Sequence, residues 1–183
     1  QEPLGETIPN FHNMEFRMSQ LIEAVENDKF CRIDDPEEGD GRHPIDNDPD
    51  HSDEVIAMID EIDENSIEMC KAEQMFREGV LPKRICHCDT KVDNILFDQN
   101  DHVLCVIDLD TVMPSFIFSD YGDFLRSAAN FVAEDCPEIE KVGFNMEVFK
   151  AFTKGYLKTA SKFLTPIEIE NLPYAATLFP YMQ

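Results

Sequence analysis

The sequence predicts an α+β fold that is predominantly helical and contains one small β-hairpin. Apolar residues recur at helical spacing on both sides of a central stretch of short apolar runs. Within that stretch, the turn-forming DQND lies between NILFD and HVLCVID, a pattern typical of a hairpin. With 183 residues, 43% of them hydrophobic, the chain can bury the core of one domain or of part of a larger one.

The chain is strongly acidic, with 38 Asp and Glu against 15 Lys and Arg and a formal net charge of −23. Such a charge repels nucleic acid and anionic membrane, so we expect neither as a partner. No apolar run approaches the roughly 20 residues that a bilayer requires. The six cysteines include no CxxC pair, and the first residues lack the pattern of a signal peptide. We therefore expect reduced thiols and a cytoplasmic location.

The N-terminal part of the chain predicts two helices separated by an acidic loop. Residues 14–27 place apolar side chains at helical spacing. Residues 34–54 then hold ten acidic residues, three prolines and two glycines, which favours a solvated loop; the ligand order of an EF-hand is missing. Ser52 can cap a long helix that ends at Gly79.

The second half predicts short strands followed by helices. RICH, NILFD and HVLCVID are expected to be strands, the last two forming the hairpin. Ser119 or Asp120 can cap a helix over residues 121–134, and Asn145 can cap another. The latter carries an aromatic stripe that we expect in the core, and TPIE at residues 165–168 is a capping box.

The polar residues of HCDTKVDN and VIDLDTV point to phosphate chemistry. Asp89 enters the hairpin through a loop and Asn94 follows five residues later, so the two side chains can converge. A carboxylate there can accept a proton from a substrate hydroxyl, and an amide oxygen is a hard ligand that suits Mg²⁺. Asp108, at the end of the second hairpin strand, supplies a charged metal ligand beside Asn94. These are the working parts of phosphoryl transfer.

These motifs also resemble a known superfamily. HCDTKVDNILFD is similar to the H-x-D-x-x-x-x-N catalytic loop of protein kinases and their small-molecule relatives. VIDLDTV resembles the segment that replaces D-F-G in aminoglycoside phosphotransferases and choline kinases. Together with SDYGDFLRSAAN, the sequences of these motifs are most similar to the N-acetylhexosamine 1-kinase branch of that superfamily.

The resemblance implies the C-terminal lobe of a protein-kinase-like fold, with a catalytic loop at residues 84–98 and a metal-binding segment at residues 103–112. It implies an ATP- and Mg²⁺-dependent kinase that phosphorylates a hydroxyl of a small molecule. The sequences of the motifs favour a sugar as that molecule. The net negative charge leaves a cationic aminoglycoside open as an acceptor. The implied roles are these: Asp89 is the base, Lys91 steadies the transferred phosphoryl group, Asn94 and Asp108 hold Mg²⁺, Asp110 lies at a second metal or the phosphates, His87 orients the loop, and Asp123 anchors its backbone.

The same resemblance implies a domain organisation. We expect a connecting segment and helix at residues 1–33, the acidic loop at residues 34–52, and the kinase-like C-terminal lobe at residues 53–183. The nucleotide lobe, with its phosphate-binding loop and strand lysine, is absent from this sequence. We therefore expect these residues alone to be inactive.

Alternatives remain open at this point. VIDLDTV is also similar to the first motif of haloacid-dehalogenase-type phosphatases, with Asp108 as nucleophile and Asp110 as acid/base; that fold requires a doubly wound sheet. A non-catalytic interaction domain on a kinase-like scaffold is a third possibility. Lys91 can be a solvated turn residue, and Asp123 can be a helix N-terminal acid.

Overall fold

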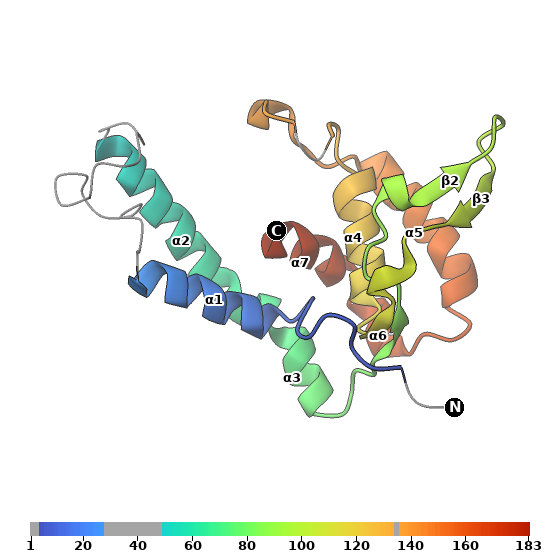
Figure 1. The fold of residues 1–183 in the computed structure, drawn as a ribbon, viewed down its shortest axis with the longest axis horizontal. Coiled ribbons are helices and arrows are strands. Elements are labelled where there is room, and N and C mark those ends of the chain that lie inside the picture. Colours follow the sequence, from blue (N-terminus) through green and yellow to red (C-terminus); the bar gives the residue numbers. More distant parts are fainter. Residues whose placement is uncertain (1–3, 28–48, 134–135) are drawn as a thin grey trace. The chain divides into compact units, whose positions relative to one another are not determined.

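The computed structural model describes residues 4–27, 49–133 and 136–183, with side chains from residue 55 onward in the second range. The chain divides into two compact units, which are described separately: one comprises residues 13–74, and the other comprises residues 1–12 and 75–183. Most of the described residues are helical, and the strands form two small antiparallel sheets (Figure 1). The predicted α+β, predominantly helical class is confirmed.

The unit of residues 13–74 is built from helices. α1 spans Met14–Asn27, as predicted, and buries Met14 and Met18. The Glu73 side chain accepts a hydrogen bond of 2.6 Å from the backbone N–H of Met14, which satisfies one of the free donors at the start of that helix. The acidic stretch up to residue 48 lies outside the described residues.

The long helix expected from Ser52 to Gly79 differs from the structure in two respects. It begins earlier, because α2 spans Pro49–Met69 and places Ser52 inside the helix rather than at its cap. It is also interrupted at Cys70, and a separate helix α3 spans Lys71–Arg77. Gly79 does end the helical stretch, with a left-handed φ of 75° that glycine adopts without steric cost.

The larger unit contains two two-stranded sheets. β2 (Ile95–Phe97) and β3 (Val103–Val106) form the predicted hairpin (Figure 1). β1 (Arg84–Cys86) pairs with β4 (Met113–Ser115), a strand that the sequence analysis missed. All described pairings are antiparallel, so the described chain lacks the doubly wound parallel sheet that the phosphatase alternative requires.

Four helices complete this unit: α4 (Phe118–Ala128), α5 (Met146–Ala160), α6 (Pro166–Glu170) and α7 (Leu172–Met182). α4 begins before Ser119 and Asp120, so neither residue caps it as predicted. The Asn145 cap of α5 and the capping box at Thr165 are confirmed. α4 packs against α7, and the buried side chains between and around them form the core: Phe118, Tyr121, Leu125, Leu172, Leu178 and Phe179.

The predicted aromatic stripe of α5 enters this core only in part. Phe152 stacks on Phe124 with ring centroids 4.0 Å apart, and Tyr156 contacts Tyr121. Phe163 follows the end of α5 and is 54% exposed. The stripe is therefore a packing surface over its middle turns.

The five cysteines among the described residues are all free, and Cys31 lies outside them. Within the described part of the chain, no helix has both the length and the apolar composition needed to cross a membrane.

Candidate active site

The loop of residues 87–94 connects β1 to the hairpin and carries most of the predicted site residues. Its backbone is held by Asp120 in the first turn of α4. The Asp120 carboxylate accepts the N–H of His87 at 3.1 Å and that of Cys88 at 2.9 Å. Thr90 Oγ1 donates to the Asp120 carbonyl oxygen at 2.7 Å. One acidic residue therefore fixes both the start and the middle of the 87–94 loop.

The underside of the 87–94 loop is apolar. Cys86 and Cys88 are buried and cluster with Met113, and Phe11 packs against them. Cys88 adopts a left-handed φ of 66°, which is uncommon for a residue with a side chain and marks a sharp change of chain direction. Burial raises the pKa of the Cys88 thiol to about 12. We therefore interpret this thiol as part of the buried apolar cluster and not as a nucleophile.

Asp89 and Asn94 converge, as their spacing predicts. The Asn94 side chain is buried, and its Nδ2 donates to Asp89 Oδ2 at 2.9 Å and to the Asp89 carbonyl oxygen at 2.8 Å. Since both donor contacts use Nδ2, the Asn94 side-chain oxygen is turned away from Asp89. Lys91 Nζ lies 3.4 Å from Asp89 Oδ2. The Asp89 side chain remains 24% exposed, so a small molecule can reach its carboxylate.

His87 is fixed in one tautomer by its partners. Its Nε2 lies 2.9 Å from the carbonyl oxygen of Ile107, which can only accept, so Nε2 carries the proton. Its Nδ1 accepts the N–H of Asp89 at 3.3 Å. The ring thus ties Asp89 to the segment that contains Asp108.

The segment after β3 lies against the 87–94 loop. The Ile107 N–H donates to the Asn94 carbonyl oxygen at 2.9 Å, and Thr111 Oγ1 donates to the His87 carbonyl oxygen at 2.7 Å. Between them, Asp108 has a left-handed backbone with φ 64° and precedes the short 3₁₀ helix η2 (Leu109–Thr111). Asp108 and Asp110 are both exposed.

Asp123 lies one turn after Asp120 on the same face of α4, as an i,i+3 spacing requires. Its Oδ1 accepts from Arg126 Nε at 3.1 Å and Nη2 at 2.9 Å, while its buried Oδ2 has no hydrogen-bond partner among the described residues. Burial raises the pKa of Asp123; Arg126 and the Thr90 N–H oppose that shift, and the charge of Asp89 adds to it. Asp123 therefore lies close to the 87–94 loop.

The backbone-anchoring role expected of Asp123 stays a prediction, and Asp120 on the same helix makes hydrogen bonds of that kind. The hydrogen bonds to the His87 and Cys88 N–H groups are made by Asp120. The sequence analysis considered Asp120 only as a helix cap. The i,i+3 pair of aspartates on one helix face was the available signal, and it would have indicated that both side chains face the same neighbour.

Among the described residues, no group of three or more His, Cys, Asp and Glu side chains comes together as a metal site. The oxygen atoms near Asp89 that could bind a metal belong to the Asn94 amide and to the exposed carboxylates after β3. The Asn94 amide is held in place by its Nδ2 contacts. Such a set provides one amide and one or two carboxylates, which leaves most positions around a cation to water or substrate.

A comparison with protein-family models agrees with the motifs. The model of the phosphotransferase enzyme family, APH, matches residues 18–152, a range that includes the whole 87–94 loop, the Asp108 segment and α4. The match extends over more than half of the 183 residues. The chain therefore belongs to the phosphotransferase enzyme family.

Proposed function

We propose that this protein transfers the γ-phosphate of ATP to a hydroxyl group of a small molecule. Its family membership supports the phosphoryl transfer. The observation that carries the proposal is the contact between Asn94 Nδ2 and Asp89 Oδ2 at 2.9 Å, which holds a solvent-accessible carboxylate in one orientation beside the Asp108 segment. A fixed carboxylate next to hard oxygen ligands is the arrangement that phosphoryl transfer requires.

In this proposal Asp89 is the general base. Its carboxylate takes the proton of the acceptor hydroxyl, whose oxygen forms a bond to the γ-phosphorus while the bond from that phosphorus to the leaving oxygen of ADP breaks. Lys91, whose Nζ lies 3.4 Å from the same carboxylate, would steady the transferred group. His87 donates to the Ile107 carbonyl and accepts from the Asp89 N–H, so it orients the loop without exchanging a proton.

Asn94 and Asp108 would hold Mg²⁺, with Asp110 at a second metal or at the phosphates. Mg²⁺ typically takes one or two carboxylates, keeps several waters and binds substrate phosphates, so the sparse oxygen set described above fits it. The ion supplies charge neutralisation at the phosphates. Both residues would offer the ion a ligand atom whose position is fixed. The Nδ2 contacts hold the Asn94 side chain, and the hydrogen bond from the Ile107 N–H to the Asn94 carbonyl oxygen holds the backbone next to Asp108.

We propose a sugar as the acceptor, with an N-acetylhexosamine as the first compound to test. This choice is supported by the resemblance of the motifs in residues 84–130 to the N-acetylhexosamine 1-kinase branch. The two alternatives are not favoured. The described strands are antiparallel, which does not support the phosphatase fold, and the ordered Asp89–Asn94 pair gives no reason to assume a non-catalytic module.

The test is ATP consumption by the intact protein with sugars, aminoglycosides and choline as acceptors, in the wild type and in Asp89→Asn. Loss of a general base typically costs on the order of 10²- to 10⁴-fold in turnover, and ATP affinity should be unchanged. Asp93→Asn is the matched control, because it makes the same chemical change at an exposed position of the same loop. Wild-type turnover in Asp89→Asn would exclude Asp89 as the base.

A further inference from the structure

The segment of residues 4–12, which precedes α1, contacts the chain on both sides of the candidate site. Glu6 accepts a hydrogen bond from Lys83 Nζ at 2.8 Å, directly before β1. Thr7 Oγ1 donates to the carbonyl oxygen of Val112 at 3.3 Å, between η2 and β4. Two side chains therefore tie this N-terminal segment to the strand that leads into the 87–94 loop and to the residues that follow Asp110.

The apolar contact of the N-terminal segment is made by Phe11. Asn10, directly before it, has a left-handed φ of 57°, which Asn adopts more readily than most residues and which turns the chain there. The half-buried side chain of Phe11 packs against the cluster of Cys86, Cys88 and Met113. Phe11 is therefore in contact with the apolar underside of the 87–94 loop.

The same side chain is connected to the core of α4 and α7. The Phe11 ring stacks on His12 with centroids 4.3 Å apart, and His12 meets Phe179 edge-on at 4.9 Å. Phe179 is almost fully buried in α7, where it also lies against Gly122 of α4. A series of ring contacts thus joins the helical core to the cluster below the loop, and Phe11 is the last member of that series.

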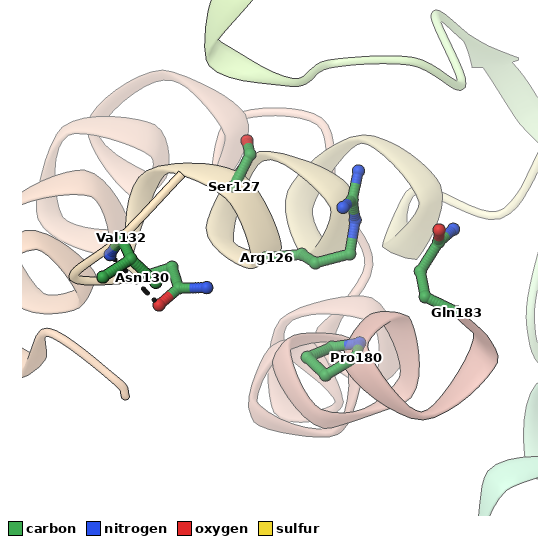
Figure 2. A pocket seen from close by; sticks show the side chains of 6 residues that line it. All are labelled: Arg126, Ser127, Asn130, Val132, Pro180 and Gln183. Atoms are coloured by element: carbon green, nitrogen blue, oxygen red, sulfur yellow. Dashed lines mark hydrogen bonds between the residues drawn. The ribbon is translucent and has the colours of Figure 1, made fainter. Parts of the chain in front are cut away.

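The left-handed backbone of Cys88 needs contacts to hold it, because such a conformation is unfavourable for a residue with a side chain. α4 supplies polar contacts to the loop. Asp120 accepts the Cys88 N–H at 2.9 Å, and Ser127, which also lines the pocket shown in Figure 2, accepts the Val92 N–H through Oγ at 3.2 Å. The Cys88 side chain is held separately, by the apolar cluster that Phe11 packs against.

We propose that Phe11 is a positioning residue, whose ring keeps Cys88 in its left-handed conformation and thereby orients Asp89, the next residue in the chain. Without the ring, the cluster would be underpacked and Cys88 would be free to relax toward an ordinary φ, which would redirect the Asp89 side chain. The effect of Phe11 on turnover rests on the proposed function. Its effect on the 87–94 loop does not, because the order of the loop can be measured without turnover.

The test compares Phe11→Ala with Phe149→Ala in the intact protein. Phe149 is the matched control, because it is also half-buried and packs against one ring, that of Phe144 with centroids 5.4 Å apart, but lies on α5. Hydrogen–deuterium exchange followed by mass spectrometry measures the backbone N–H groups of residues 87–94. Urea denaturation measures the global stability of each variant, and steady-state kinetics measure kcat and the KM for ATP.

We expect Phe11→Ala to speed the exchange of the 87–94 loop about tenfold, because local opening becomes easier, while Phe149→Ala leaves it near that of the wild type. In Phe11→Ala, kcat should fall about tenfold to a hundredfold through misplacement of Asp89, with the KM for ATP unchanged. Phe11→Leu, which keeps part of the apolar volume, should lie between Phe11→Ala and the wild type in both measurements.

The inference is overturned if Phe11→Ala leaves loop exchange unchanged, or if Phe11→Ala and Phe149→Ala speed it equally. Should either Ala variant fail to fold, Phe11→Leu and Phe149→Leu are compared by the same criterion.

These outcomes separate the positioning role from the reaction. If loop exchange follows the expected pattern but the wild type consumes no ATP with any acceptor, the hold of Phe11 on the loop stands and the proposed function fails. If Asp89→Asn abolishes turnover while Phe11→Ala keeps the wild-type kcat, the proposed function stands and the positioning role of Phe11 is overturned.

Discussion

The 87–94 loop keeps its shape through hydrogen bonds to a few single residues. Asp120 accepts two backbone N–H groups with its two different oxygens, at 3.1 Å and 2.9 Å. Burial raises the pKa of Asp120, and those two N–H groups oppose the shift. Its side chain is thus a connection between α4 and the loop that carries Asp89, and we regard it as a positioning residue.

Asp120→Asn should loosen the loop. An amide retains one oxygen but places an NH₂ group against the second backbone N–H, so one charge-assisted bond is lost and a repulsive contact takes its place. We expect a loss of about 2 kcal/mol in the free energy of unfolding. We also expect lower turnover with little change in the KM for ATP, as measured by urea denaturation and by steady-state kinetics.

Asp98→Asn is the control for this change. Asp98 also accepts two backbone N–H groups, those of Asn100 and His102, but through a single oxygen that an amide retains. Its turn lies at the far end of the hairpin from the 87–94 loop, so turnover should be near that of the wild type. Equal kinetic effects of the two substitutions would contradict the positioning role of Asp120.

At the scale of elements, the close approach of α4 and α7 sets the position of Asp120 and Asp123. Gly122, between those two aspartates, allows this approach. A Cβ atom at Gly122 would lie 2.5 Å from Phe179 Cδ2 and closer still to the carbonyl oxygen of Ala175. Because one of these contacts is with backbone, side-chain rearrangement alone cannot relieve it.

Gly122→Ala should therefore destabilise this unit by about 3 kcal/mol through overpacking. The matched control is Gly155→Ala in α5, where an added Cβ meets nothing within 4 Å. In a helix interior that substitution should raise stability by about 1 kcal/mol. Thermal and urea denaturation of both variants measure the difference, and a shift of the same sign in both would contradict the close packing of α4 on α7.

β1 is joined to α6 by an ion pair. Arg84 Nε donates to Glu168 Oε1 at 2.6 Å and Nη2 donates to Oε2 at 2.8 Å, while the same carboxylate completes the capping box with Thr165. Glu168 is fully buried. Burial acts to raise its pKa, but Arg84 and the Thr165 donors outweigh it and hold the pKa below the ordinary 4.5.

Arg84→Met should cost about 3 kcal/mol near pH 7, because it leaves the Glu168 carboxylate buried without its cation. A depressed carboxyl pKa contributes stability that is fully present above 4.5 and is lost as the pH falls through the lower folded value. The stability difference between wild type and variant should therefore shrink as the pH falls below 4.5. Urea midpoints measured across this range test it.

Lys141→Met is the control, since Lys141 pairs with Glu138 on the surface and both side chains are more than half exposed. Surface pairs of this kind contribute little. A difference between wild type and Arg84→Met that grows at acid pH would show that the Glu168 carboxylate does not depend on Arg84.

At the scale of the whole molecule, a strongly acidic chain belongs to a family of phosphotransferases. The family match at residues 18–152 includes residues from both compact units. The net charge of −23 does not describe the local environment of the reaction. Lys91 pairs with Asp89 and Arg126 pairs with Asp123, so each of these two carboxylates has a cation beside it.

The sequence by itself determined the features that depend on neighbours in the chain. The helix of residues 14–27, the hairpin, the Asn145 cap and the Thr165 capping box follow from local spacing and side-chain chemistry, and the structure confirms them. The convergence of Asp89 and Asn94 was also predictable, because five residues in a tight loop bring the two side chains together.

Only the tertiary structure decided the contacts between residues far apart in the chain. β4 was not predicted because three residues carry too little periodicity, and its partner β1 lies some 30 residues earlier. Asp120 resembled a helix cap until its carboxylate was found on the backbone of residues 87 and 88. The packing of α7 on α4 likewise joins residues that lie some 50 positions apart, such as Gly122 and Phe179. Such contacts form when separate elements bury their apolar faces together, and local sequence patterns do not record which faces will meet.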